Sequence, residues 1–305
     1  MNEPRQFPGM RISTNAVLAV AIILFAAATC FFCSQSLHAQ DQKVVWTSQE
    51  KAIFEQIRTL RQLPDDTRAR VTKDLALQIR QLPASENKVQ LAIDLASLST
   101  EGDFGHDTLQ EVATTLAGAL REHPVPREQN GPAAPYMELA ELVRYEHVQA
   151  SLDDTQFAAA TAKFEAYDQD RQKADFTLSD LQGKSWTLRE LQGKVVLVNF
   201  WATWCPPCRK EMPDLQALFN QFRGQGLVVL AISDEDESKV RPFIAEKNIT
   251  YPVLLDPEGK VGTLFQIGGI PKSFVYDRTG KMVAQSIDMR TRGQFLEMLS
   301  HAGLH

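Results

Sequence analysis

An apolar strand that runs directly into a pair of cysteines restricts the possible folds of this chain most strongly. The six residues 195–200 are mostly β-branched or aromatic and show no polar alternation, a pattern typical of a strand buried on both faces of an α/β sheet. Pro206 and Pro207 then suit the first turn of a helix, where backbone N–H groups lack partners anyway. The pattern therefore places Cys205 at a helix N-terminus, at the end of a central strand.

The composition is that of a globular protein with room for about two domains, because 44% of the 305 residues are hydrophobic and 23% are charged. The formal net charge is -6 and no basic block is present, so the sequence does not support nucleic-acid binding. Two of the four cysteines, Cys30 and Cys33, lie in an apolar N-terminal stretch. Cys205 and Cys208 are therefore the only pair in the remainder of the chain.

The N-terminus, residues 1–39, has the features of a secretory signal. Arg5 and Arg11 precede an apolar run over residues 16–33, and the small residue Ala39 marks the expected cleavage position before a polar chain begins. An uncleaved membrane anchor is the alternative, because the apolar run is close to the shortest length that spans a bilayer. Either interpretation exports the rest of the chain into an oxidising compartment and leaves membrane association through this segment open.

Residues 47–173 read as an all-α helical domain without a chemical motif. Thr47 and Glu50 resemble a capping box, and Asp65 or Asp66 is the expected cap of the next helix. Further helices are predicted over residues 86–99, 107–122, 136–149 and 153–170. The sequence does not choose between a partner-binding or dimerising module and a spacer.

Residues 175–305 change to short strands separated by turn signals. A hairpin leads into the central strand, and the cysteine helix is followed by a second buried strand at residues 227–232, which predicts a β-α-β unit with parallel strands. A second hairpin is predicted around residues 278–280, and a last helix covers roughly residues 291–302. The acidic run 234–237 reads most simply as a solvated helix start.

Three segments together resemble a known family. They are the aromatic strand end with its cysteine pair at residues 200–208, the Gly-Gly-Ile-Pro sequence at 268–271, and the hairpin at 277–281. This combination is similar to thioredoxin-fold proteins of the TlpA/ResA type over about residues 175–304. The resemblance implies an α/β thioredoxin-like C-terminal domain, with a central mixed sheet flanked by helices, behind the helical domain and the signal or anchor segment.

Disulfide exchange needs a thiolate nucleophile, and the positive end of a helix lowers a cysteine pKa. Cys205 has that place, so it is the expected nucleophile. Cys208 lies one helical turn further on the same side and is the expected resolving cysteine, which makes the pair a redox-active disulfide. A permanent structural disulfide and a zinc or copper site are the alternatives, although no second cysteine pair or nearby histidine completes a metal site. We expect no metal and no cofactor.

The resemblance also assigns a proton-transfer role to Glu211, because this family carries a glutamate there, whereas thioredoxin has a strand aspartate where this chain has Asn199. An exposed acid that favours the helix dipole is the alternative for Glu211. Pro271 resembles the cis-proline that packs against the cysteines in this fold, and Ile270 would offer its backbone to an extended substrate. The residues expected to support the site or contact substrate are Trp204, Pro206, Pro207, Ile270 and Pro271.

The resemblance favours an exported, periplasmic thiol-disulfide oxidoreductase of the protein-disulfide reductase type. In that family, electrons come from a membrane thiol transporter, and substrates include apocytochrome c cysteines in cytochrome c biogenesis. No histidine lies between the two cysteines, which also favours reduction. A copper-binding assembly chaperone for a respiratory oxidase is an alternative. A thiol peroxidase is less favoured, because position 202 is Ala rather than Thr or Ser.

Overall fold

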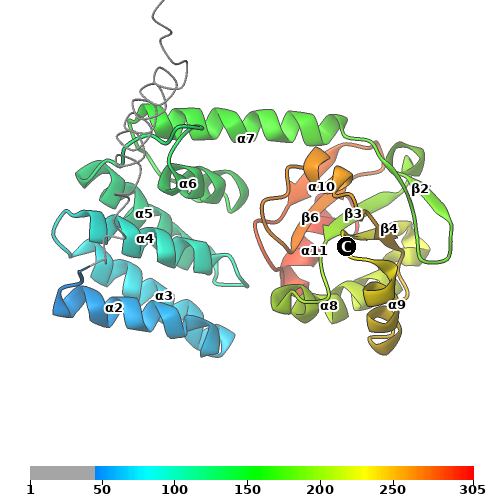
Figure 1. Cartoon of the computed structure of the whole chain (residues 1–305), viewed down its shortest axis with the longest axis horizontal. Coiled ribbons are helices and arrows are strands. Elements are labelled where there is room, and N and C mark those ends of the chain that lie inside the picture. Colours follow the sequence, from blue (N-terminus) through cyan, green and yellow to red (C-terminus); the bar gives the residue numbers. More distant parts are fainter. Residues whose placement is uncertain (1–44) are drawn as a thin grey trace, which may run out of the picture. The chain divides into compact units, whose positions relative to one another are not determined.

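The computed structural model describes residues 45–305 of the chain. The predicted signal peptide or membrane anchor at residues 1–39 lies outside the described residues. Within residues 45–305, no helix combines the length and the apolar character needed to cross a membrane. Residues Trp46–His305 form one compact unit (Figure 1).

Helices account for the first part of this unit, as the sequence predicts. They are α2 (Ser48–Thr59), the 3-10 helix η1 (Leu60–Gln62), α3 (Asp65–Arg80), α4 (Glu86–Ser99), α5 (His106–Glu122), α6 (Ala134–Tyr145) and α7 (Thr155–Lys173). The predicted capping box is confirmed, because the Thr47 hydroxyl accepts the Glu50 N–H and the Glu50 carboxylate accepts the Thr47 N–H. We call α2 to α7 the helical region.

Several predicted helix bounds are wrong, including those of the helix predicted over residues 153–170, which runs from Thr155 to Lys173. The N-cap of α3 is Pro64 rather than Asp65 or Asp66. Asp65 is already helical, and its carboxylate instead lies 3.2 Å from the Lys210 ammonium group. Helix α6 ends at Tyr145 rather than at residue 149, because His147 adopts a left-handed backbone with φ 55° that a right-handed helix cannot contain.

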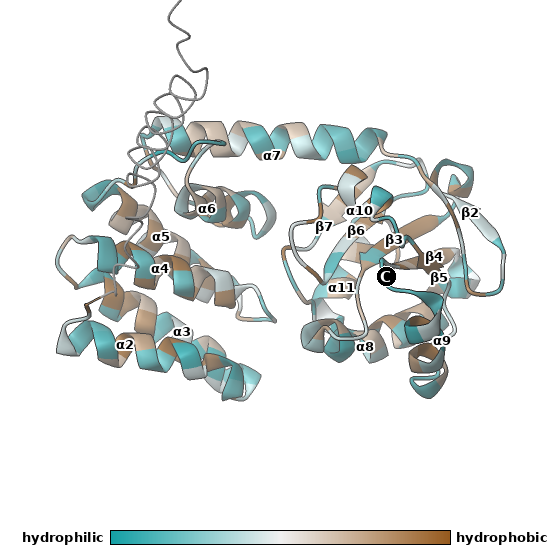
Figure 2. Cartoon of the chain, viewed as in Figure 1, coloured by the Kyte–Doolittle hydropathy of each residue, from teal (hydrophilic) through white to brown (hydrophobic). Residues whose placement is uncertain are grey.

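The helical region has its own apolar core, made by the inward stripes of its helices. Its fully buried members include Ile53, Leu75, Ile79, Leu91, Leu95, Leu116, Tyr136 and Leu139. Helix α7 differs, since Figure 2 shows mainly hydrophilic residues along it. Only Ala160, Phe164 and Arg171 of α7 are buried, so this helix contributes less to the core than its length suggests.

The second part of the unit is built around a mixed five-stranded sheet. Its strands have the order β5 (Val253–Leu255), β4 (Leu227–Ser233), β3 (Val195–Phe200), β6 (Lys272–Tyr276) and β7 (Met282–Gln285). Strand β3 pairs in parallel with β4 and antiparallel with β6. A separate hairpin joins β1 (Thr177–Ser179) to β2 (Ser185–Thr187).

Helices complete this α/β part. They are η2 (Leu188–Leu191), α8 (Pro206–Phe222), η3 (Arg223–Gln225), α9 (Glu237–Glu246), α10 (Lys260–Leu264) and α11 (Arg292–Ser300). Alternate residues of β3 enter two separate cores: Val195 and Leu197 pack with α8, α9 and α11, whereas Val196 and Val198 pack with α10 and the β1–β2 side. Because both faces are covered, all six residues of β3 are buried, as predicted. The expected thioredoxin-like α/β domain, with a mixed sheet flanked by helices, is confirmed.

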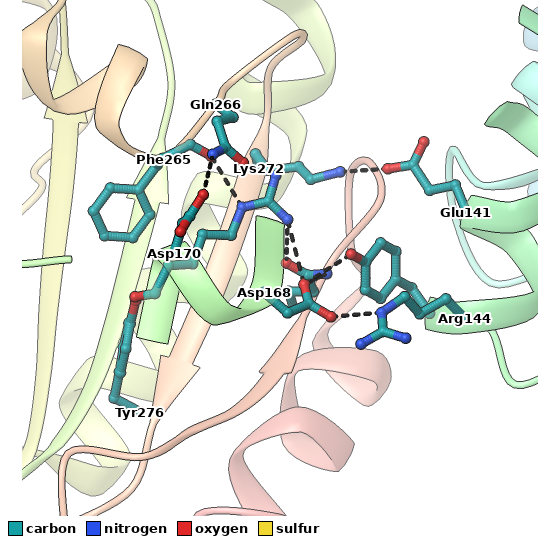
Figure 3. A network of polar contacts seen from close by, with 11 residues as sticks. Glu141, Arg144, Asp168, Asp170, Phe265, Gln266, Lys272 and Tyr276 are labelled. Atoms are coloured by element: carbon teal, nitrogen blue, oxygen red, sulfur yellow. Dashed lines mark hydrogen bonds and ion pairs between the residues drawn. The ribbon is translucent and has the colours of Figure 1, made fainter. Parts of the chain in front are cut away.

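Polar contacts fasten the helical region to the α/β part (Figure 3). The Arg171 guanidinium, at the end of α7, donates to the Phe265 carbonyl at 3.0 Å and to the Gln285 side chain at 3.1 Å. From α6, Glu141 accepts a hydrogen bond from Lys272 at 2.8 Å. Lys272 directly follows Pro271, so one of these contacts reaches the segment beside the cysteine pair.

Candidate active site

The two cysteines lie at the start of α8 and are joined by a disulfide. Cys205 is the N-cap residue of α8, and its sulfur accepts the backbone N–H of Cys208 at 3.2 Å. Pro206 and Pro207 fill the first two helical positions, where no N–H group is needed. The predicted placement of Cys205 at a helix N-terminus is thus confirmed.

Both cysteines are buried in this oxidised state, with 2% of Cys205 and 0% of Cys208 exposed. The Ile270 carbonyl oxygen lies 3.7 Å from the Cys205 sulfur. The chain segment before Pro271 therefore packs against the pair.

The peptide bond between Ile270 and Pro271 is cis, as expected from the resemblance. A groove of about 540 Å³ runs beside this segment, and its lining combines Ile270 and Ile267 with Phe200 and Trp204. Trp204 is 66% exposed, which is unusual for so large an apolar side chain. The groove and Trp204 therefore offer an apolar surface close to the disulfide.

Glu211 lies one helical turn beyond Cys208 and is only 2% exposed. Its carboxyl accepts a hydrogen bond from the Asn199 amide at 2.8 Å and another from the backbone N–H of Arg290 at 3.1 Å. Burial raises the pKa of Glu211 to about 8, although both hydrogen bonds and the Arg290 charge act in the opposite direction. The alternative of an exposed first-turn acid is wrong.

Asn199 supports Glu211 from the central strand. Its amide also donates to the Ser273 hydroxyl of β6 at 3.0 Å, so the side chain bridges two neighbouring strands. A neutral amide here holds Glu211 without adding a second negative charge. The carboxyl of Glu211 and the amide of Asn199 thus form a buried pair in which only Glu211 is acidic.

Glu235 is a residue of this site that the sequence did not indicate. The acidic run 234–237 was expected to be solvated, but Glu235 is buried. Its carboxylate accepts the backbone N–H of Thr203 and, at 2.9 Å, the Thr203 hydroxyl. Glu235 thereby fixes the loop two residues before Cys205. No local pattern in a run of four acidic residues marks which one turns inward.

Among residues 45–305, no group of three or more His, Cys, Asp or Glu side chains has the geometry to hold a metal ion.

Trp201 is buried and stacks at a tilt on Phe243, with ring centroids 5.7 Å apart. It therefore belongs to the core beneath the site, whereas Trp204 faces solvent. What the arrangement offers chemically is a cysteine pair at a helix start, a buried carboxyl behind it and an apolar groove beside it.

Comparisons with known proteins agree with this chemistry. The model of the AhpC/TSA family matches residues 170–285. The chain is 36% identical over 125 residues to a thiol-disulfide oxidoreductase ResA of Bacillus cereus, covering 41% of this chain and 72% of that protein. It is 37% identical over 109 residues to ResA of Geobacillus thermodenitrificans, covering 35% of this chain and 63% of the relative.

Among solved structures, the chain is similar to a thiol:disulfide interchange protein of the thioredoxin family from Chlorobium tepidum TLS. The two share 32% identity with a TM-score of 0.39, over 42% of this chain and 92% of the other.

Proposed function

Since the chain belongs to the family of ResA-type thiol-disulfide oxidoreductases, we propose that Cys205 and Cys208 reduce disulfides of proteins outside the cytoplasm. The observation that carries this proposal is the pairing of a helix-capping cysteine with a buried carboxyl one turn behind its partner. A helix start stabilises a thiolate, and a carboxyl with a pKa near working pH can exchange a proton with a buried thiol.

The reaction follows from these positions. The Cys205 thiolate attacks one sulfur of the substrate disulfide, whose second sulfur leaves and takes up a proton. Cys208 then loses its proton to the ionised Glu211 carboxylate and attacks the Cys205 sulfur. This step breaks the mixed disulfide, forms the Cys205–Cys208 bond and releases the second substrate sulfur as a thiolate, which takes up a proton from water, while Glu211 keeps the proton of Cys208. Two electrons thereby reach the substrate.

Substrate binding is assigned to the groove beside Pro271. Ile270 and Trp204 line this groove, and Ile270 would offer its backbone to an extended segment. Pro206 is exposed and Pro207 half-buried beside Trp204, and both would add apolar contact outside the groove. Cysteine-containing segments of unfolded proteins, such as an apocytochrome c before haem attachment, have the required chemistry. A membrane thiol transporter is the proposed electron donor.

Export by residues 1–39 is part of this proposal. It is supported by the composition of that segment and by the use of a lone cysteine pair in the rest of the chain. Fusing residues 1–39 to a reporter enzyme that is active only outside the cytoplasm tests it. An inactive fusion that remains in the cytoplasm would contradict export.

The substrate is best tested by trapping. In Cys208→Ala the resolving thiol is missing, so the mixed disulfide on Cys205 should persist and can be isolated with its partner. The double variant Cys205→Ser/Cys208→Ala is the matched control and should trap nothing. If both variants yield the same partners, the proposed exchange at Cys205 is wrong.

The direction of transfer is tested by the reduction potential of the pair. A reductase should lie near the potential of thioredoxin, about -270 mV, and a strong oxidant near about -120 mV. A value near the upper figure, measured against a glutathione buffer, would contradict the reductase assignment.

The other two functions have less support. Ala202 is buried and provides no hydroxyl three residues before Cys205, where a peroxidase needs one. The cysteines also have no metal-binding side chains grouped around them among the described residues. Thiol-disulfide exchange is the function that the site supports best.

A further inference from the structure

The buried carboxyl of Glu211 is held by a residue from a distant loop. Arg290 lies between β7 and α11, and its backbone N–H donates to Glu211 Oε2 at 3.1 Å. Arg290 is itself buried. The position of this loop therefore decides whether Glu211 keeps the second of the two hydrogen bonds described above.

The side chain of Arg290 binds the helical region. Its guanidinium donates to the carboxylate of Glu146, the C-cap residue of α6. The side chains of Arg290 and Glu146 are only 5% and 9% exposed, so the pair is almost fully removed from water. Other ion pairs between these parts are more open, such as Lys210–Asp65, with 55% and 49% exposure.

Burial makes this contact specific. An exposed ion pair adds little, whereas removing one partner of a buried pair leaves a charge without compensation. In the position that Arg290 occupies, its guanidinium is paired with the Glu146 carboxylate. That position also presents the Arg290 N–H to Glu211.

We propose that Glu146 is a positioning residue for Glu211, acting through Arg290, so that the helical region takes part in setting the environment of the redox site. This inference rests on the proton-transfer role proposed for Glu211. It gives the helical region a function that its sequence alone did not indicate.

The charged groups around Glu211 and around the Arg290–Glu146 pair decide in which direction a substitution should shift the pKa of Glu211. Near Glu211, Arg290 lowers the pKa, Asp214 on the same helix raises it, and the neighbouring Tyr251 is a neutral phenol whose own pKa is raised by burial. A cavity of about 800 Å³ adjoins the Arg290–Glu146 pair. Its other titratable lining groups are Asp103, His106, Arg144, Tyr145, His147, Asp168, Glu297 and His301.

The test is the pH dependence of single-turnover reduction of a chromogenic aromatic disulfide by the pre-reduced full chain. Glu146→Gln keeps the shape but removes the charge that neutralises Arg290, so the inflection due to Glu211 should fall by about half a pH unit. Arg290→Met keeps the backbone N–H but removes the positive charge, so the inflection should rise. Asp65→Asn, which breaks the exposed ion pair between the same two parts, is the matched control and should leave the inflection unchanged.

A second measurement separates positioning from general loosening. In Glu146→Gln the amide of Arg290 should exchange its hydrogen several-fold faster, whereas amides of β3 should exchange as in the parent protein.

Two failures can be told apart. If Glu211→Gln removes the inflection but neither Glu146→Gln nor Arg290→Met moves it, the positioning role of Glu146 is wrong. If Glu211→Gln itself leaves the inflection in place, the proposed role of Glu211 is wrong, and the inference drawn from it is overturned with it.

Discussion

Lys88 in the helical region and Glu211 in the α/β domain are both only 2% exposed, but their partners differ in kind. The Lys88 ammonium donates to two backbone carbonyls at 2.9 Å and to the Glu122 carboxylate at 2.7 Å. Glu211 accepts hydrogen bonds from an amide side chain and a backbone N–H, and neither of these two donors carries a formal charge. Lys88 is compensated in charge by its hydrogen-bond partners and Glu211 is not.

This difference separates a structural role from a chemical one. A buried charge with an opposite charge and a full set of hydrogen bonds holds its neighbours in place. A buried carboxyl whose hydrogen-bond donors are uncharged has a pKa near neutral pH. Such a group can give up or accept a proton during a reaction. Changes at the two positions should therefore affect different properties.

Removing the reactive sulfur should have the largest effect. Cys205→Ser should lower the rate of disulfide reduction at least about a thousand-fold, because a hydroxyl at this position is a far poorer nucleophile than a thiolate. Turnover of a model disulfide with dithiothreitol as donor measures this rate. The fold of the helical region should be the same in this variant. Unchanged turnover would contradict the proposed role of Cys205 as the nucleophile.

Glu211→Gln should change how stability depends on pH. The pKa of Glu211 is raised in the folded protein, from an ordinary value of 4.5 to about 8, so folding favours the protonated form. The stability that this group contributes is complete below pH 4.5 and is lost as the pH rises through about 8. The oxidised parent protein should lose up to about 1.4 kcal/mol per pH unit in this window relative to Glu211→Gln.

Denaturant unfolding of both proteins between about pH 5 and pH 9 measures this difference. Parallel stability curves across the window would contradict the assignment of a protonated, buried Glu211.

Lys88→Met should lower the stability of the protein without changing its reaction rate. Two carbonyls, of Arg80 and Leu82, lose their donor, and Glu122 loses its partner. We expect a loss of about 3 kcal/mol in the free energy of unfolding. The rate of disulfide exchange at room temperature should be unchanged, and a fall in that rate would show that the helical region carries chemistry at this position too.

Trp204→Ala should give the smallest effect. Because Trp204 is 66% exposed, its loss should change the free energy of unfolding by no more than about 0.5 kcal/mol. Reduction of an apolar peptide disulfide should slow about five-fold, whereas reduction of a small hydrophilic disulfide should not. Equal slowing of both substrates would indicate that Trp204 shapes the cysteine pair rather than binding substrate.

The elements of the site with local signals were predictable from the sequence. A largely apolar run predicts β3, two prolines predict the start of α8, and the spacing of three residues places Cys208 one turn after Cys205. The turn glycines were informative as well, since Gly280 in the β6–β7 hairpin has a φ of 82° that favours glycine. The resemblance added the cis bond before Pro271.

The features of the site that the sequence did not predict depend on contacts between distant segments. Glu235 reaches Thr203 across 32 positions, and Arg290 reaches Glu211 across 79. No local periodicity encodes which acidic residue of a run turns inward, or that a loop arginine will bind a helix 144 positions earlier. Such contacts are set by how the sheet and helices pack, which a pattern of neighbouring residues does not contain.

The cysteine proposed as the nucleophile, Cys205, is also the N-cap residue of α8. Because the Cys208 N–H donates to the Cys205 sulfur, the first turn of α8 is held by an atom whose acceptor strength changes with its oxidation state. A thiolate is a much stronger acceptor than a disulfide sulfur, so every electron pair gained should tighten the helix start and every pair delivered should loosen it. The redox state of the cysteine pair should therefore change the stability of the first turn of α8.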